Sequence, residues 1–149
     1  MEVHVRSARL TDLDASMRIL ALDATDADVE RHDEADYLRN LLFVPSATVV
    51  VAEEERRIVG VGVLAIRPSA RSGPFVGVID EMGVARESAL GAADRLRVAG
   101  EIVEHLVASA RNKGCTRVEV AGPLASAEPT LWKRIGFASR GRTLSRATG

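Results

Sequence analysis

Hydrophobic and polar positions follow two different periods along the chain, and these periods predict the helices and strands. Between Asp94 and Gly114 the apolar residues recur every three to four positions, which predicts one long amphipathic helix. Other segments are β-branched and continuous or alternate strictly, which predicts strands. The expected helices cover residues 11–21, 35–42, 94–114 and 128–134, and the expected strands cover residues 2–6, 48–52, 58–66, 75–84, 116–121 and 140–145.

The order of these elements predicts how the strands pair. Residues 48–66 contain two strands joined by a short charged turn, which is typical of an antiparallel hairpin. Residues 75–121 run as strand, helix and strand, which predicts a parallel pair with a right-handed crossover. The chain shows no internal repeat or linker, so we expect a single domain over residues 1–149. Its expected fold class is α/β (α+β), with helices on the faces of a mixed sheet.

The start of the long helix is a candidate anion site. The first backbone N–H groups of a helix have no partner within it, and they face the positive end of the helix dipole. Arg95 and Arg97 stand next to these groups in the sequence. Free N–H groups together with positive charge favour a phosphate at this position.

Composition excludes several classes of function. A formal net charge of −1 gives no general attraction to nucleic acid or to a membrane surface. Aromatic residues make up 3% of the chain, so we expect no base-stacking surface. The single cysteine, Cys115, excludes an internal disulfide and fits the reducing cytoplasm. The beginning of the chain has no apolar leader segment, and no apolar run reaches membrane-spanning length. We therefore expect a cytoplasmic protein without a metal site.

Charge is distributed unevenly along the chain. Acidic residues concentrate in its first quarter and arginines near its end, and such runs are more often solvated faces than functional surfaces. The acidic residues are Asp12, Asp14, Asp23, Asp26, Asp28, Glu30, Asp33, Glu34 and Asp36, and the arginines are Arg134, Arg140, Arg142 and Arg146.

Two adjacent carboxylates, Asp80 and Glu81, interrupt the otherwise apolar strand over residues 75–84. Because side chains alternate along a strand, only one of the two should face a given side, and a β-bulge would exchange them. They are candidates for general base catalysis, and the alternative is that they only bond a neighbouring arginine. Cys115 is a weaker candidate, since no histidine lies near it in the sequence to activate a thiol.

Four segments, in this order, resemble motifs of the GNAT superfamily of acyl-CoA-dependent N-acetyltransferases. Residues 5–8 resemble its opening strand, and residues 57–60 (RIVG) resemble its hairpin strand. Residues 79–84 (IDEMGV) are similar to the strand that lines the thioester in that family. Residues 131–137 (LWKRIGF) resemble its C-terminal signature, which is the most specific of the four matches.

The resemblance implies a fold, a donor and a set of site residues. It implies a GNAT-like mixed sheet of about six to seven strands with about four helices, and acetyl-CoA as the acyl donor. It implies that Glu81, with Asp80, takes the proton from an attacking amine. It also implies that backbone groups of residues 82–84 hold the pantetheine arm and that the amides of residues 95–100 hold the diphosphate. The implied cofactor-binding residues are Met82, Gly83, Val84, Arg95, Leu96, Arg97, Val98, Ala99, Gly100 and Trp132.

The chain departs from the family pattern at three points. The family's glycine-rich diphosphate loop aligns best with residues 94–99 (DRLRVA), where Arg97 takes the place of a glycine. A second alignment, over residues 97–102, restores a glycine and places Glu101 beside the phosphates. A frequent catalytic tyrosine aligns with Trp132, and a frequent asparagine aligns with Ala125.

These observations give two hypotheses about function. The first is an N-acetyltransferase that acts on a primary amine, and the acidic first quarter favours a cationic small molecule or a lysine side chain as acceptor. The second is a catalytically silent GNAT-fold module for binding or assembly, which the departures favour. The resemblance also allows a homodimer.

Overall fold

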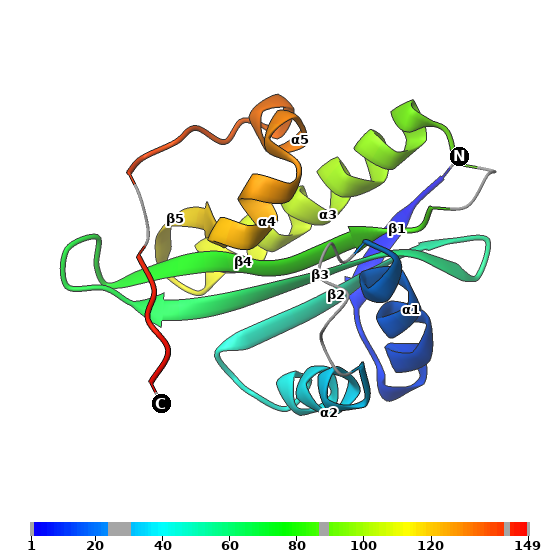
Figure 1. Ribbon diagram of the computed structural model, residues 1–149, viewed down its shortest axis with the longest axis horizontal. Coiled ribbons are helices and arrows are strands. Elements are labelled where there is room, and N and C mark those ends of the chain that lie inside the picture. The colour runs from blue at the N-terminus through cyan, green and yellow to red at the C-terminus, as the bar shows by residue number, and fades with distance from the viewer. Residues whose placement is uncertain (1, 24–30, 87–89, 142–143, 149) are drawn as a thin grey trace.

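The computed structural model describes residues 2–23, 31–86, 90–141 and 144–148. Its described strands form one sheet in the order β1-β2-β3-β4-β5 (Figure 1). The strands are β1 His4–Ser7, β2 Ala47–Glu54, β3 Arg57–Pro68, β4 Phe75–Val84 and β5 Cys115–Val120. The helices are η1 Leu10–Asp12, α1 Leu13–Asp23, α2 Arg31–Leu41, α3 Ala92–Asn112, α4 Gly122–Ala127 and α5 Pro129–Ile135.

The sheet is mixed, as the sequence predicts. Strands β1 to β4 pair antiparallel in sequence order, and β4 pairs parallel with β5 through the α3 crossover. The described part of the chain has five strands, fewer than the expected six to seven. A strand over residues 140–145 is not observed, because residues 138–141 and 144–148 have no regular structure and residues 142–143 lie outside the described residues.

Helices cover both faces of the sheet (Figure 1). On one face α1 contacts β3 and β4, and α2 contacts β2. On the other face α3 contacts all five strands, and α4 and α5 lie beside it. We call these the α1 face and the α3 face. The core lies on both faces of the sheet: Val98, Ile102 and Leu106 of α3 are each 0% exposed, and Ile19 of α1 is 5% exposed.

Two glycines in β3 allow α3 to approach the sheet closely. A Cβ atom on Gly60 would lie 2.7 Å from Ile102 Cδ1, and one on Gly62 would lie 2.6 Å from Ile102 Cγ2. Both distances are shorter than a normal carbon–carbon contact, so any side chain at these positions would displace the helix. These glycines also identify which residues of β3 face α3, and the site depends on this assignment.

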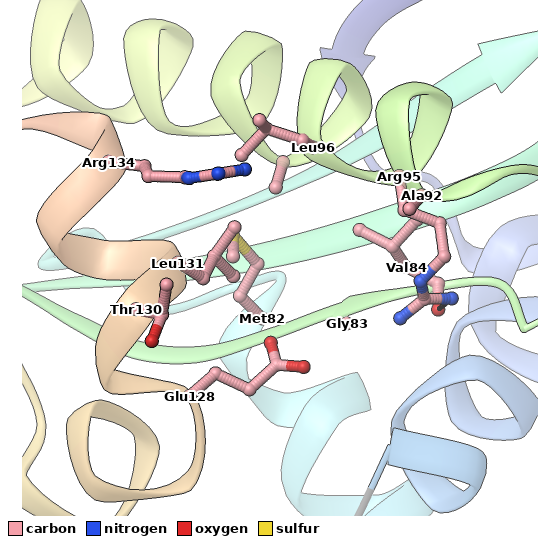
Figure 2. Close-up of a pocket in the computed structure, with 11 residues that line it drawn as sticks. Met82, Gly83, Val84, Ala92, Arg95, Leu96, Glu128, Thr130, Leu131 and Arg134 are labelled. Atoms are coloured by element: carbon pink, nitrogen blue, oxygen red, sulfur yellow. Dashed lines mark hydrogen bonds between the residues drawn. The ribbon is translucent and has the colours of Figure 1, made fainter.

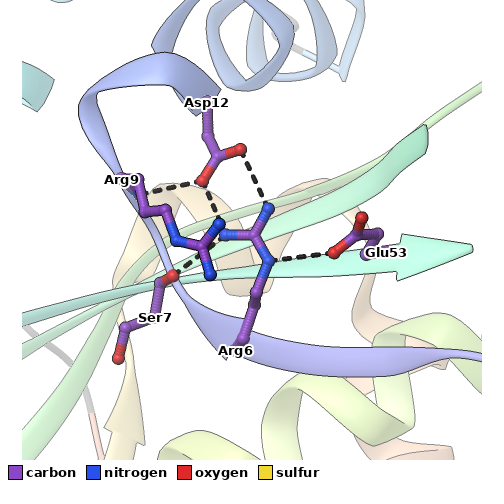
Figure 3. A network of polar contacts seen from close by, with 5 residues as sticks. All are labelled: Arg6, Ser7, Arg9, Asp12 and Glu53. Atoms are coloured by element: carbon purple, nitrogen blue, oxygen red, sulfur yellow. Dashed lines mark hydrogen bonds and ion pairs between the residues drawn. The ribbon is translucent and has the colours of Figure 1, made fainter. Parts of the chain in front are cut away.

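A buried ion-pair network joins the N-terminal strand to β2 and to the first helical turn (Figure 3). Arg6 donates to both carboxylate oxygens of Asp12 at 2.7 and 3.0 Å and to Glu53 Oε2 at 2.9 Å. Asp12 Oδ2 also accepts a hydrogen bond from the Arg9 backbone N–H at 2.8 Å. The expected helix over residues 11–21 is observed with different bounds, as a short 3₁₀ turn over Leu10–Asp12 followed by α1, because the Asp12 carboxylate caps the start of that turn.

Candidate active site

Strands β4 and β5 part halfway along β4. Their parallel pairing ends at Ile79 and Val120, and the Ala121 N–H donates the last hydrogen bond to Ile79 O at 3.0 Å. The chain then turns away into α4, whereas β4 continues to Val84. Among the described residues, no strand therefore lies beside the last five residues of β4 on this edge.

A cleft of about 280 Å³ opens at this gap, between β4, the start of α3 and α5 (Figure 2). Apolar side chains of β4, α3 and α5 lie close together within it, and arginines stand at two of its walls (Figure 2). The lining residues are Met82, Gly83 and Val84 of β4; Ala92, Arg95, Leu96 and Ala99 of α3; and Glu128, Thr130, Leu131 and Arg134 at α5.

A β-bulge at Asp80 determines which residues of β4 face the cleft. Ile79 pairs with Leu64 and Glu81 pairs with Val63, so Asp80 is an extra residue in β4. Beyond the bulge, Met82 pairs with Gly62, which faces α3. Met82 therefore lies on the α3 face, and Glu81 lies on the α1 face. Without the bulge, strand alternation would place Glu81 on the same face as Ile79.

The bulge leaves Glu81 at the edge of the gap. Glu81 Oε1 accepts a hydrogen bond from the Met82 backbone N–H at 3.2 Å. The Ala85 N–H donates to Val59 O of β3 at 2.8 Å, so strand alternation directs the backbone of Val84 and Met82 to the opposite edge, toward the cleft. Both Asp80 and Glu81 have exposed side chains, and neither lines the cleft itself.

Arg95 connects α3 to the end of β4. Its Nη1 donates to Val84 O at 3.0 Å and to Ala85 O at 2.6 Å. Both acceptors are backbone carbonyl oxygens at the mouth of the gap, and in Figure 2 the Arg95 guanidinium lies beside Val84. The Arg95 side chain thus fixes the distance between the two elements that form the right-hand end of the cleft in this view.

The free amides at the start of α3 are not those of residues 95–100. Helix α3 begins at Ala92 with Gly91 as its N-cap, and the Arg95 N–H donates to Gly91 O at 3.0 Å. Residues 95–100 therefore lie inside the helix, where their amides bond to preceding carbonyls. The N–H groups without an intrahelical partner at the start of α3 belong to residues 92–94, so these, rather than the amides of residues 95–100, are free to meet an anion.

The cleft contains some of the predicted cofactor-binding side chains and not others. Arg95, Leu96 and Ala99 line it together with residues 82–84. The remaining four predicted residues do not. Arg97 is exposed, Val98 is 0% exposed in the core, Gly100 is half-buried, and Trp132 is 4% exposed.

Trp132 is a core residue rather than part of the cleft wall. Its Nε1 donates to Leu124 O at 3.2 Å, and its ring packs edge-to-face against Phe137 with centroids 5.5 Å apart. The indole thus joins α5 to α4 and to the chain after Gly136. A side chain held in this way does not reach a ligand in the cleft.

Five residues of the cleft wall were not predicted as site residues, and a simple pattern identifies three of them. The five are Ala92, Glu128, Thr130, Leu131 and Arg134. Glu128, Leu131 and Arg134 are spaced by three, which places them on one face of α5. All three line the cleft. The residues 131–137 motif already marks this segment, so its spacing could have been used to select Arg134 as a second cation.

Cys115 lies away from the cleft. It pairs with Phe75 at the opposite end of the β4–β5 ladder. Burial raises the pKa of its thiol, and the nearby charge of Lys113 opposes that shift. A raised pKa disfavours the thiolate, so Cys115 is not placed or activated as a nucleophile. No group of three or more metal-binding side chains occurs among the described residues.

Comparison with known proteins identifies the family. The sequence profile of the acetyltransferase (GNAT) family matches residues 14–137. No curated protein sequence matches the chain significantly. In the part of the chain that the structure describes, none of the helices has the length and apolar content needed to cross a bilayer.

Solved structures share the fold at low sequence identity. An aminoglycoside antibiotic 6′-N-acetyltransferase from Acinetobacter haemolyticus is 15% identical with a TM-score of 0.80, covering 98% of each chain. A predicted acetyltransferase with acetyl-CoA from Clostridium acetobutylicum is 18% identical with a TM-score of 0.74, covering 98% of this chain and 96% of that one. Glucosamine-6-phosphate N-acetyltransferase from Arabidopsis thaliana is 15% identical with a TM-score of 0.74, covering 100% of both chains. These similarities establish the fold.

Proposed function

The chain belongs to the acetyltransferase (GNAT) family, and on that premise we propose that it transfers an acetyl group from acetyl-CoA to a primary amine. The observation that carries this proposal is the cleft where β4 parts from β5. This cleft extends to the start of α3, where the first backbone N–H groups have no intrahelical partner. A cleft between two parted parallel strands accepts an extended arm that pairs with the exposed strand edge. The structurally similar acetyltransferase from Clostridium acetobutylicum was solved with acetyl-CoA.

The residues of the cleft fit this donor. Acetyl-CoA supplies the acyl carbon as an activated thioester. Met82, Leu96 and Leu131 offer an apolar wall to a pantetheine arm, and the Val84 backbone lies at its edge. The amides of residues 92–94 offer hydrogen bonds to a diphosphate, and the Arg134 side chain on the α5 wall adds positive charge to the cleft.

Proton removal from the acceptor is the most demanding part of the reaction for this chain. An alkylammonium with a pKa near 10.4 requires about 4.6 kcal/mol to lose its proton at pH 7. Glu81, which lies on the α1 face at the gap, is the residue that we propose as the base, directly or through a water. The amine nitrogen then bonds the acyl carbon as the carbon–sulfur bond breaks.

The remaining requirements need no special side chain. A backbone N–H of the segment from Met82 to Val84 stabilises the charge that develops on the carbonyl oxygen. An ordinary thiol has a pKa of about 8.5. If such a thiol leaves as the unprotonated thiolate at pH 7, the cost in free energy is about 2 kcal/mol at most. The replacement of a tyrosine acid by the buried Trp132 is therefore expected to slow the reaction rather than prevent it.

We propose that the reacting group of the acceptor is a primary amine that is cationic in water, carried by a small molecule or by a lysine side chain. The basis is the acidic first quarter of the chain. Much of that quarter cannot be placed, because the side chains of residues 21–35 lie outside the described residues. Of the described carboxylates, Asp12 is neutralised by Arg6, while Asp14 and Asp36 lie on α1 and α2.

An assay of thiol release tests the proposal. The chain is incubated with acetyl-CoA and a panel of primary amines, and free thiol and acetylated amine are measured together. Equal amounts of the two products, in excess over the enzyme, are the expected result. Binding of acetyl-CoA without turnover of any amine would instead favour the catalytically silent binding module, for which the buried Trp132 is the supporting observation.

A further inference from the structure

A cluster of charged residues lies on the α1 face of the sheet, outside the cleft. Arg117 donates from Nε and Nη2 to Glu119 Oε1 at 3.0 and 2.6 Å. Arg67 reaches the other oxygen of the same carboxylate, with Nη2 3.5 Å from Glu119 Oε2. We call Arg67, Arg117 and Glu119 the charged cluster.

The strand register places the charged cluster across β4. Arg67 pairs with Val76, and Val78 pairs with Glu119 on the other side of β4. Since Gly77 faces α3, its neighbours Val76 and Val78 face the opposite way. The two arginines thus stand on β3 and β5, on either side of β4, over the fully buried Val76.

The same face carries Glu81, the proposed base. Val78 pairs with Ala65 and Glu81 pairs with Val63, so the rows of Glu119 and Glu81 are two residues apart along β3. Two residues of antiparallel strand span about 7 Å. Arg67 itself stands four residues from Val63, about 14 Å along β3, but its guanidinium reaches Glu119 Oε2 at 3.5 Å. The charged ends of the cluster therefore lie within the length of a small acceptor whose amine lies at Glu81.

The charged cluster has more positive than negative charge, and solvent reaches it. Two guanidinium groups share one carboxylate, and the side chains of Arg67, Arg117 and Glu119 are 51%, 36% and 37% exposed. A guanidinium has five N–H donors in a planar fork that fits a carboxylate or phosphate. In Figure 1 the ends of β3 and β4 near their connecting hairpin extend beyond α1 and α2, and the C-terminal segment passes across them in this view.

We propose that the charged cluster binds an anionic group at the far end of the amine acceptor, and so selects acceptors that carry both a primary amine and a carboxylate or phosphate. The proposal rests on the proposed acetyltransferase function. Arg67 is the principal contact, because its one contact with Glu119 is long and its side chain is the more exposed of the two arginines. Glu119 holds both guanidinium groups in place and competes with the acceptor's anion for them.

A set of matched acceptors tests the selectivity. 6-Aminohexanoate is compared with hexylamine and 1,6-diaminohexane, and 5-aminopentyl phosphate separates a preference for phosphate from one for carboxylate. We expect an anionic acceptor to have a KM at least about fivefold lower than hexylamine, as for a partly exposed ion pair. Equal KM values for the anionic and neutral acceptors, or a preference for 1,6-diaminohexane, would overturn the proposal.

Variants separate binding from a structural role. Arg67→Gln and Arg117→Gln should each raise the KM of the anionic acceptor about fivefold, leaving kcat and the KM of hexylamine unchanged. Glu119→Gln should lower the KM of the anionic acceptor, because it removes the competing carboxylate. The matched control is Arg57→Gln, since Arg57 lies at the other end of β3 and its side chain is also 51% exposed. A Glu119→Gln variant that raises every KM would show that the charged cluster is only structural.

A binding measurement keeps the proposal testable if no amine is acetylated. Backbone amide NMR signals of Arg67, Val76 and Arg117 are followed while 6-aminohexanoate is added. Shifts that are absent with hexylamine and are lost in Arg67→Gln support the charged cluster as an anion site. In that case the absence of turnover contradicts only the proposed acetyl transfer. Unchanged signals would overturn the proposal independently of turnover.

Discussion

Arg95 donates a hydrogen bond from Nη1 to the carbonyl oxygen of Val84 at 3.0 Å, and this contact joins the first turn of α3 to the last residue of β4. The same nitrogen also reaches Ala85 O at 2.6 Å. In the part of the chain that the structure describes, this end of β4 has no strand partner on the side of the cleft, since β5 has already ended at Val120. Arg95 therefore supports the wall of the cleft from within the protein.

Replacing Arg95 by methionine should lower the free energy of unfolding by about 1–3 kcal/mol, because two buried carbonyls lose a charged donor. Urea denaturation measures the change. Arg97→Met is the control, since it removes the same charge from the exposed side of the same helical turn, and it should change stability by less than about 0.5 kcal/mol. Equal effects of the two substitutions would show that the carbonyl contacts contribute nothing specific.

Glu81→Gln should lower kcat by about 10²-fold or more, because an amide cannot accept the proton of the amine. Its affinity for acetyl-CoA should not change, since Glu81 does not line the cleft. Asp80→Asn is the matched control, because it makes the same change at the neighbouring bulge residue. Steady-state kinetics and calorimetric titration measure the two quantities. A larger loss of kcat in Asp80→Asn than in Glu81→Gln would show that Asp80, and not Glu81, is the base.

The ion pair of Asp12 with Arg6 predicts sensitivity to acid. Hydrogen bonding to Arg6 holds the pKa of the Asp12 carboxyl below its usual value, with burial opposing and the Arg9 backbone N–H assisting. Because the folded pKa is below the unfolded one, this contribution to stability is present above the unfolded pKa and is lost as pH falls through the folded pKa.

Asp12→Asn should therefore be less stable than wild type at pH 7 and should lose less stability on acidification. Urea denaturation at several pH values between 7 and 3 measures this difference. Asp14→Asn, on the next turn of the same segment, is the control. Parallel pH profiles for wild type and Asp12→Asn would contradict the assignment.

Ser16 carries a hydroxyl that is buried without a hydrogen-bond partner among the described residues. Its side chain is 1% exposed on α1, which packs on β3 and β4. Ser16→Ala removes the desolvated hydroxyl and should raise the free energy of unfolding by about 1 kcal/mol. Ser109→Ala is the control, because Ser109 Oγ lies 3.5 Å from Thr48 Oγ1 and should not gain stability in this way. A clear loss of stability in Ser16→Ala would show that the hydroxyl makes a stabilising contact.

Much of the fold follows from short-range patterns in the sequence. The strand over Phe75–Val84 has the predicted bounds, and the apolar stripe of α3 faces the sheet as expected. Helix α4 is not among the predicted helices, since Gly122 and Pro123 are typical turn residues. The proline is tolerated here because it lies in the first turn, where its missing N–H has no intrahelical acceptor.

The candidate site is harder to predict, because it depends on how the strands pair. The bulge at Asp80 shifts every later residue of β4 to the other face, and the Asp80–Glu81 pair alone does not fix its position. Helix α3 begins two residues before the predicted start at Asp94, because the helix-forming Ala92 and Ala93 follow the N-cap Gly91 ahead of the apolar stripe. The charged cluster lies on two strands that are far apart in sequence, so no local spacing identifies it.

The central claim is that acetyl-CoA binds in the cleft with its diphosphate at the start of α3. The most direct test is to measure the affinity for acetyl-CoA of two charge variants in the first turn of this helix. Ala92 lines the cleft, whereas Ala93 is exposed in the same helical turn and does not. Glutamate in the first turn suits the helix dipole, so both variants should fold. By calorimetric titration, Ala92→Glu should bind acetyl-CoA about tenfold or more weakly than wild type, because its carboxylate repels the diphosphate, and Ala93→Glu should bind nearly as wild type. Equal affinities for all three proteins, or no binding by wild type, would contradict a nucleotide thioester in this cleft.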